Sequence, residues 1–75
     1  MSGLILYQRD DCHLCDLAYA VLCEAGVGDF DSVFIDGEAE LERCYGTRVP
    51  VLRCGEDELD WPFTAPQIRA LMRAG

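Results

Sequence analysis

The stretch that decides the fold is LILYQRDDCHLCDLAYAVLCEAG, residues 4–26. A short apolar run at residues 4–7 ends at a polar group, Gln-Arg-Asp-Asp, which predicts a buried strand followed by a loop. From His13 onward the apolar residues fall at helical spacing, and a glycine follows them as a C-terminal cap. Two cysteines, Cys12 and Cys15, lie where one pattern gives way to the other. The stretch therefore predicts strand, loop and helix, with a Cys-x-x-Cys pair at the first turn of the helix.

The helix that follows the cysteine pair is predicted to bury one apolar stripe. The residues at helical spacing are Leu14, Leu17, Ala18, Val21, Leu22 and Ala25. After the turn, residues 33–35 predict a second strand. Asp36 is placed to cap a second helix, which we expect to end at Gly46.

The last third of the chain predicts a hairpin and a closing helix. Residues 47–54 alternate apolar and polar side chains and pair with residues 58–61 across a Gly-Glu-Asp turn. Thr64 opens a capping box, Thr-Ala-Pro-Gln, for a final helix that is expected to bury Ile68, Leu71 and Met72. The predicted order is β-α-β-α-β-β-α, an α/β chain with a parallel beginning and an antiparallel end.

Size and charge exclude several classes of protein. The chain has 75 residues, with 14 Asp and Glu against six Arg and no Lys, for a formal charge of −8. One compact domain, residues 1–75, is the most that this length supports. Lys and Arg supply most of the affinity for nucleic acid and acidic membranes, so neither is expected as a partner. No signal peptide pattern or membrane-spanning run is visible, and we expect a cytoplasmic monomer.

The cysteines divide into two groups. Five cysteines would suggest a disulfide framework in a secreted protein, but the count is odd and no export pattern is present. Cys23, Cys44 and Cys54 lie alone within apolar patterns, so they are predicted to be small buried side chains. Chemistry is left to Cys12 and Cys15.

A cysteine at the start of a helix is predicted to be a nucleophile. The unpaired N–H groups and the helix dipole stabilise a thiolate at Cys12, while Cys15, one turn deeper, can attack a mixed disulfide on Cys12 and resolve it. A protonated His13 would lower the thiol pKa further, although a solvent-facing histidine is an equal alternative. The negative charges of Asp10, Asp11 and Asp16 oppose a second anion. We expect a thiolate that is moderately activated.

These residues resemble the glutaredoxins of the thioredoxin-fold superfamily. The likeness rests on a strand followed by Arg9-x-x-Cys12-x-x-Cys15, and on a later Thr-Arg-Val-Pro-Val segment, residues 47–51, before a hairpin. It is closer to a small bacterial glutaredoxin-like group marked by Cys-His-Leu-Cys, Tyr-Gly-x-Arg-Val-Pro-Val-Leu and a late Trp-Pro. The resemblance implies a three-layer fold with a four-stranded mixed sheet, and a thiol-disulfide oxidoreductase that reduces protein or glutathione mixed disulfides.

The resemblance also implies roles for residues outside the cysteine pair. Pro50 would be a cis-proline facing the cysteines, and Val49 would offer its backbone N–H and C=O to a bound peptide or glutathione. Arg9, assisted by Arg48, would meet a glutathione carboxylate. An anion could also bind the N–H groups at the helix start formed by Thr64. No tightly bound cofactor is implied. Glutathione is expected as a co-substrate, with protein disulfides as clients and either glutathione or a reductase protein as electron donor.

The chain also departs from the glutaredoxin pattern, and two other functions stay open. His13 stands where glutaredoxins usually have proline, and residues 58–64 replace their Gly-Gly segment and Asp. One alternative is iron-sulfur or metal binding through the cysteine pair, although a structural zinc site needs four ligands and we assign no metal site. The other is a non-catalytic interaction module that uses the aromatic cluster at residues 61–63, for which packing under the last helix is the favoured use.

Overall fold

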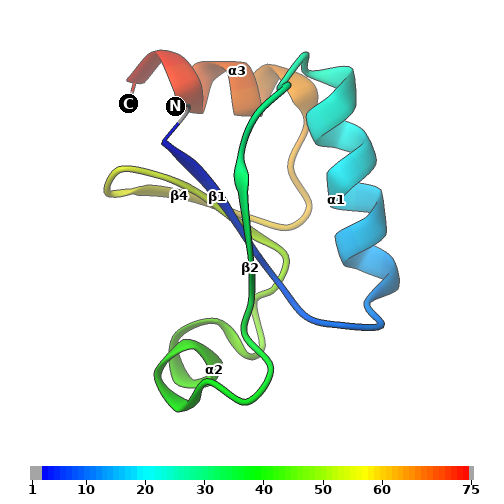
Figure 1. Cartoon of the computed structure of the whole chain (residues 1–75). Helices are drawn as coiled ribbons and strands as arrows, with labels where there is room; N and C mark the ends of the chain where they lie inside the picture. Colours follow the sequence, from blue (N-terminus) through cyan, green and yellow to red (C-terminus); the bar gives the residue numbers. More distant parts are fainter. Residues whose placement is uncertain (1–2, 75) are drawn as a thin grey trace.

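A computed structural model describes residues 3–74 of the chain (Figure 1). Its elements are, in order, β1 (Leu4–Gln8), α1 (His13–Glu24), β2 (Asp31–Phe34), α2 (Ala39–Tyr45), β3 (Val51–Cys54), β4 (Asp57–Asp60) and α3 (Ala65–Ala74). The predicted order of strands and helices is confirmed. Within residues 3–74 no helix has the length and apolar character that a membrane crossing requires.

The four strands form one mixed sheet in the order β2-β1-β3-β4. β1 and β2 run parallel and α1 is the crossover between them, whereas β3 is antiparallel to both β1 and β4. The parallel pair and the hairpin were both predicted from the sequence. β1 lies between β2 and β3, so the loop that leads from its carboxyl end to α1 starts between these two neighbouring strands.

The two faces of the sheet carry two separate clusters of apolar side chains. Leu4, Leu6 and Leu52 are fully buried on the face that α1 and α3 cover. Tyr7 and Val51 belong to the cluster on the opposite face, where Tyr45 of α2 packs against them. This alternation is what the period of two along a strand requires. The three layers expected from the glutaredoxin resemblance are therefore present, with α1 and α3 near each other and α2 apart from them (Figure 1).

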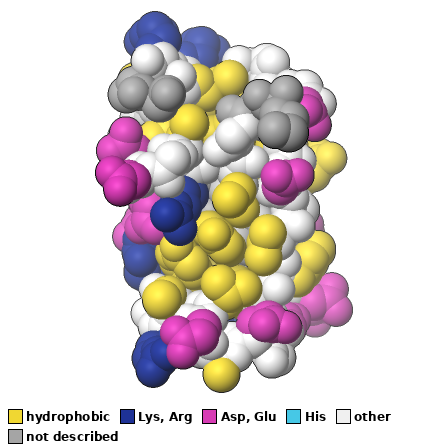
Figure 2. Space-filling model, turned by 60° about the vertical axis from the view of Figure 1, so that its left-hand side comes forward, with side chains coloured by type: hydrophobic (Ala, Val, Ile, Leu, Met, Phe, Trp, Pro, Cys, Tyr) yellow, Lys and Arg dark blue, Asp and Glu magenta, His cyan; other side chains and the backbone are white. Residues whose placement is uncertain are grey.

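The face beside α2 is less completely covered than the face beside α1 and α3. α2 has only seven residues, and several hydrophobic side chains of its cluster remain partly exposed. Figure 2 shows hydrophobic side chains gathered on this side of the molecule, with acidic and basic side chains around them.

The buried stripe of α1 differs from the predicted one. Ala18 and Leu22 are buried as predicted, and Cys15 is buried with them. Leu14 and Leu17 are 46% and 42% exposed, contrary to expectation. The two sets lie on neighbouring faces of one helix, and apolar spacing alone does not choose between them. The consequence for function is that Cys15 points into the core.

Two of the three isolated cysteines are exposed, so the prediction that they are buried is wrong. Cys54 is buried as predicted, but Cys23 and Cys44 are exposed. Each exposed cysteine is next in sequence to a large residue that takes the buried position on its helix, Leu22 on α1 and Tyr45 on α2. A rotation of about 100° per residue then turns the cysteine away from the sheet.

The predicted capping interaction is present at the start of α3 and absent at the start of α2. Thr64 and Gln67 form the expected capping box, since the Thr64 N–H donates to Gln67 Oε1 (2.8 Å) and the Gln67 N–H donates to Thr64 Oγ1 (3.4 Å). Asp36, in contrast, does not cap α2. The N-cap is Glu38, without a side-chain cap bond, and the carboxylate of Asp36 is used by tertiary partners described below.

The end of the chain packs largely as expected. Ile68 and Leu71 are buried, but Met72 is 40% exposed because it lies at the border of the apolar stripe. Phe63 is buried in the core shared by α1 and α3, and Trp61 packs against it with ring centroids 5.1 Å apart. The preferred use of the aromatic cluster, packing under the last helix, is confirmed.

Candidate active site

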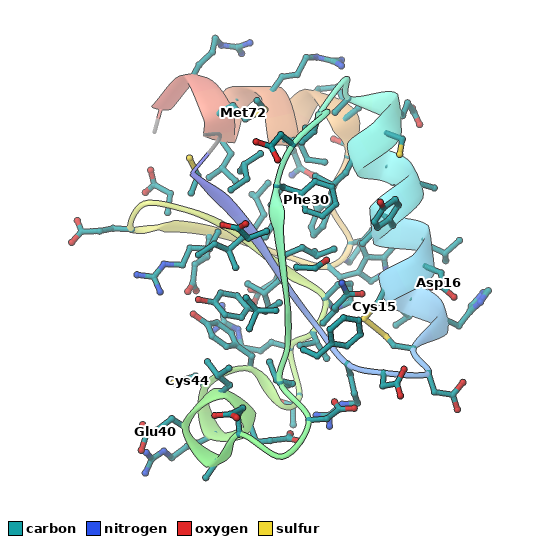
Figure 3. The ribbon with its side chains drawn as sticks, viewed as in Figure 1. Cys15, Asp16, Phe30, Glu40, Cys44 and Met72 are labelled. Atoms are coloured by element: carbon teal, nitrogen blue, oxygen red, sulfur yellow. A yellow bond between two sulfur atoms is a disulfide. The ribbon has the colours of Figure 1, made fainter. Side chains whose placement is uncertain are left out.

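The two cysteines of the Cys-x-x-Cys pair are joined at the beginning of α1. Cys12 is the N-cap residue, and its Sγ accepts a hydrogen bond from the backbone N–H of Cys15 at 3.1 Å. A disulfide links Cys12 to Cys15, with their Cα atoms 5.2 Å apart (Figure 3). Cys12 is half-buried, whereas Cys15 is only 1% exposed. One sulfur is thus open to approach and the other lies in the core.

The loop that leads from β1 to Cys12 is shaped by a pair of aspartates. Asp11 has a φ of 54°, in the left-handed region, which Asp tolerates better than most non-glycine residues. Its N–H donates to Oδ1 of Asp10 at 3.1 Å. This turn reverses the chain between the end of the strand and the start of the helix, and so places Cys12 at the surface.

A depression of about 500 Å³ surrounds Cys12. Its walls are residues 8–13, Asp16 from the first turn of α1, and Phe34 from the end of β2. Phe34 is half-exposed. The side chain of Gln8 is held at the end of β1 by a 2.6 Å hydrogen bond that its Nε2 donates to Ser32 Oγ on β2. The depression is large enough for a side chain or a short segment of a partner.

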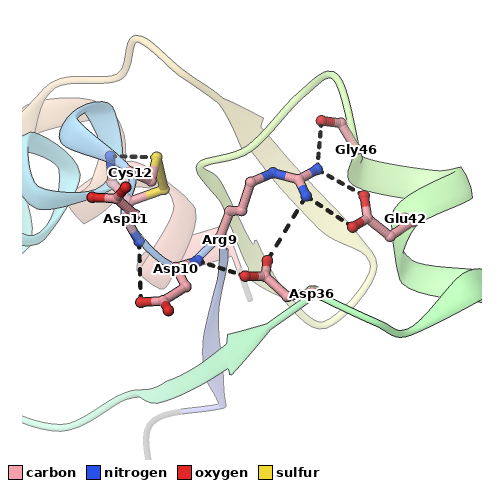
Figure 4. Close-up of polar contacts among 8 residues, drawn as sticks. Arg9, Asp10, Asp11, Cys12, Asp36, Glu42 and Gly46 are labelled. Atoms are coloured by element: carbon pink, nitrogen blue, oxygen red, sulfur yellow. Dashed lines mark hydrogen bonds and ion pairs between the residues drawn. A yellow bond between two sulfur atoms is a disulfide. The ribbon is translucent and has the colours of Figure 1, made fainter.

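Arg9 is held on the α2 side of this loop by ion pairs and hydrogen bonds (Figure 4). Its Nη1 and Nη2 donate to the two carboxylate oxygens of Glu42 at 2.8 and 2.7 Å, and Nη2 also donates to the carbonyl oxygen of Gly46 at 3.0 Å. Asp36 lies 3.8 Å from Nη1 and accepts from the Asp10 N–H at 3.1 Å. The hydrogen bond from Arg9 lowers the pKa of Glu42 below its ordinary value. This network fixes the loop before Cys12 to α2.

Arg48 is likewise occupied within the protein. Its Nη2 lies 2.7 Å from carboxylate oxygens of both Glu58 and Asp60 on β4, and its guanidinium lies over the ring of Tyr45. Hydrogen bonds to Asp60 and Glu58 raise the pKa of Arg48. Two carboxylates therefore face each of the two arginines that the glutaredoxin resemblance assigned to glutathione. Their contact with a bound glutathione stays a prediction.

Pro50 is buried, and the Val49–Pro50 peptide bond is cis. The bond between Trp61 and Pro62 is cis as well, which the sequence did not indicate. The N–H of Val49 donates to the carbonyl oxygen of Tyr45 at 3.0 Å, so in this conformation it is used inside the protein. The pairing of Val49 with a bound chain stays a prediction, as does anion binding at Thr64, whose N–H is engaged by Gln67.

The depression brings together only part of the predicted site. Arg9, Cys12 and His13 line it and Cys15 is bonded to Cys12, whereas Arg48, Val49, Pro50 and Thr64 are not among the lining residues. Sequence reasoning missed Phe34 and Gln8 in the walls and Glu42 in the support of Arg9. The strand pattern held a signal for Phe34, because it pairs with Gln8 at the carboxyl ends of two parallel strands, where functional loops gather.

A metal centre in a protein requires several ligand side chains that converge on one point. Among residues 3–74 no group of three or more His, Cys, Asp or Glu side chains is arranged to hold a metal ion.

A family model and solved structures of similar proteins match this chain over nearly its whole length. The model of the glutaredoxin-like domain family (DUF836) matches residues 3–73. An X-ray structure of the structural genomics target protein XcR50 from X. campestris is 60% identical and superposes with a TM-score of 0.87, covering 96% of this chain and 97% of that one. A solution structure of XcR50 is 59% identical, with a TM-score of 0.87, and covers 97% of this chain and 95% of that one.

A more distant structure shares the fold. The glutaredoxin grx-1 from Archaeoglobus fulgidus is 24% identical and has a TM-score of 0.67 over 97% of this chain and 88% of that chain. A search of curated proteins found no match. The family model spans nearly the whole chain, and the chain therefore belongs to the glutaredoxin-like domain family.

Proposed function

We propose that this protein is a thiol-disulfide oxidoreductase in which Cys12 is the nucleophile and Cys15 the resolving cysteine. The observation that carries the proposal is the position of Cys12: its sulfur is the N-cap of a 12-residue helix, accepts the Cys15 N–H at 3.1 Å, and opens onto a depression. N–H donors and the positive end of a helix dipole stabilise a thiolate there once the pair is reduced.

The reaction that this arrangement supports has two exchange steps. The Cys12 thiolate attacks one sulfur of a client disulfide, forms a mixed disulfide and releases the other client sulfur as a thiolate. Cys15 then loses its proton and attacks the Cys12 sulfur, which releases the second client thiol and forms the Cys12–Cys15 disulfide. The client gains two electrons and the cysteine pair loses two. Two equivalents of a thiol such as glutathione, or one dithiol reductase protein, return the pair to its reduced form.

The burial of the two sulfurs agrees with this division of roles. Cys12 is accessible enough to meet a disulfide, whereas Cys15, at 1% exposure, is shielded from the client and near enough to attack Cys12. Arg9, Glu42 and Asp36 would act by positioning the loop that carries Cys12. The proposed clients are disulfide-containing proteins of a reducing cytoplasm. Such an environment keeps the cysteine pair in its reduced form, which is the form that donates electrons.

Trapping of the mixed disulfide tests the assignment. Cys23 and Cys44 are exposed and would react as well, so the test protein carries Cys23→Ser and Cys44→Ser in addition to Cys15→Ser. Incubation with hydroxyethyl disulfide is expected to leave one adduct, which tandem mass spectrometry locates on Cys12. In the matched variant with Cys12→Ser and Cys15 intact, the buried Cys15 is expected to react far more slowly.

The same proteins test the activation of the thiolate. Iodoacetamide is expected to alkylate Cys12 at pH 6 faster than it alkylates a free cysteine peptide, because more of Cys12 is thiolate at that pH. The proposal would be contradicted if Cys12 were alkylated no faster than the peptide and if Cys15, in the Cys12→Ser protein, reacted with hydroxyethyl disulfide faster than Cys12 does in the Cys15→Ser protein.

A further inference from the structure

Carboxylates outnumber the side chains that can carry positive charge in the walls of the depression around Cys12. Asp10, Asp11 and Asp16 are exposed lining residues, and we call them the acidic rim. Within residues 3–74 none of the three forms an ion pair with an Arg or His side chain. Figure 4 shows the two loop aspartates next to Cys12, and Figure 3 shows Asp16 beside Cys15.

The positive groups near the rim do not neutralise it. Arg9 lines the depression, but its guanidinium is bound by both oxygens of Glu42 and lies 3.8 Å from Asp36, so its charge is already balanced by two carboxylates. His13 is the other lining residue that can carry positive charge. Even with a protonated His13, three carboxylates leave the surroundings of Cys12 with net negative charge. The electrostatic potential at the entrance therefore favours cations.

The lining of the depression also includes an aromatic ring. Phe34 lines the same depression and is 49% exposed. A Lys or Arg side chain is attracted by an aromatic face as well as by carboxylates, and its aliphatic stem packs on the ring. Glutathione carries two carboxylates against one ammonium, so the same rim opposes it.

Resting on the proposed function, we propose that the preferred substrate is a polypeptide disulfide flanked by Lys or Arg, rather than a glutathione disulfide. The acidic rim and Phe34 set this preference, and Cys12 performs the exchange. The chemistry is that of the two steps above: the flanked disulfide is reduced to two thiols, the Cys12–Cys15 pair is oxidised, and a dithiol restores it.

The test uses three synthetic peptides that share one disulfide loop and differ only in the flanking residues: Lys, Ser or Glu. The reduced protein, with Cys23→Ser and Cys44→Ser, is mixed with each peptide at low ionic strength, and the loss of peptide disulfide is followed by chromatography. The Lys peptide is expected to react about tenfold faster than the Glu peptide, and the ratio is expected to fall strongly in 0.5 M salt, where charges are screened within about 5 Å.

Two variants, each lacking three carboxylate charges, distinguish the effect of the acidic rim from the effect of the overall charge of −8. The rim variant carries Asp10→Asn, Asp11→Asn and Asp16→Asn, substitutions that keep side-chain size and suit the left-handed backbone at residue 11. The remote variant carries Asp29→Asn, Glu56→Gln and Asp57→Asn, exposed residues that do not line the depression. The Lys-to-Glu rate ratio is expected to drop towards one in the rim variant and to stay near the parent value in the remote variant.

Each outcome decides one of the two proposals. A ratio near one in the parent protein, with the Ser peptide reduced normally, would overturn the substrate preference and leave the oxidoreductase proposal standing. An equal drop in both variants would assign the effect to total charge and overturn the role of the rim. Failure to reduce any peptide would instead count against the oxidoreductase. If the rim variant does not fold, the single variants Asp11→Asn and Asp16→Asn are each expected to lower the ratio about twofold.

Discussion

Arg9 connects the active-site loop to α2 through one carboxylate. The Glu42 carboxylate accepts two hydrogen bonds from Arg9, at 2.8 and 2.7 Å, and the two residues are 33 positions apart in the chain. Arg9 lies in the loop after β1 and Glu42 lies in α2, so the ion pair joins the loop before Cys12 to the helix on the other face of the sheet. Glu42 therefore supports the loop from outside the depression that surrounds Cys12.

The Arg9–Glu42 ion pair predicts a pH-dependent loss of stability in Glu42→Gln. Arg9 lowers the pKa of Glu42 below its ordinary 4.5, so the carboxylate stabilises the fold above that pH, and the stabilisation is lost as the pH falls through the lowered value. The urea midpoint of Glu42→Gln should lie below that of the parent at pH 7, with the gap shrinking below pH 4.5. Glu56→Gln, at an exposed turn, controls for the gain from removing one negative charge. A gap that is constant with pH would contradict the ion pair.

Single residues were the scale at which the sequence was least informative. The position of Cys12 and Cys15 at the first turn of α1 could be predicted from their spacing, because the helix start is local. The partners of Arg9 and Arg48 could not, since both arginines bind carboxylates on elements that only the tertiary fold brings near. The same is true of Cys23 and Cys44, whose exposure depends on which face of each helix meets the sheet.

At the scale of elements, α2 ends where Gly46 lies against the preceding turn. A Cβ at residue 46 would overlap the backbone carbonyl of Glu42, and this carbonyl oxygen accepts the Gly46 N–H. Gly46→Ala is therefore expected to destabilise the protein by about 1–3 kcal/mol, measured by urea unfolding. Gly28→Ala is the control, because a Cβ there meets open space and the change should be within about 0.5 kcal/mol. Equal effects of the two substitutions would refute the clash.

The capping box of α3 gives a second test at this scale. Removing the Thr64 hydroxyl leaves the Gln67 N–H without its side-chain acceptor, and Thr64→Ala is expected to cost about 1 kcal/mol of unfolding free energy. Thr47→Ala, at an exposed residue outside the helices, is expected to change it by less than about 0.5 kcal/mol. A Thr64→Ala protein as stable as the Thr47→Ala control would show that the cap contributes nothing.

Element order was predictable because each strand and helix carries its own period. The capping box was predictable for the same reason, since its two residues are three apart. The start of α2 was not: Asp36 has the chemistry of a cap, but Arg9 and the Asp10 N–H compete for its carboxylate. The buried stripe of α1 could be predicted only in part, because Leu14 and Leu17 fit the helical spacing of Ala18 and Leu22 as well as Cys15 does.

At the scale of the whole molecule, two small apolar clusters on opposite faces of one sheet hold the fold together. The cluster beneath α1 and α3 contains the fully buried Leu4, Leu6 and Leu52, and Cys15 lies on the same face of α1 as its Ala18 and Leu22. Cys15, the proposed resolving cysteine, therefore packs in the main core, whereas Cys12 and the acidic rim lie at its edge.

A substitution in the main core should consequently unfold the molecule rather than perturb it locally. Leu52 has no exposed surface and lies on a central strand. Leu52→Ala is expected to cost about 2–5 kcal/mol, and a core of this size supplies only about 3–5 kcal/mol in all. Much of the variant should then be unfolded without urea, seen by circular dichroism and Trp61 fluorescence. Leu14→Ala, which removes a 46% exposed side chain, is expected to stay folded. Equal stability of the two variants would mean that the main core does not hold the fold.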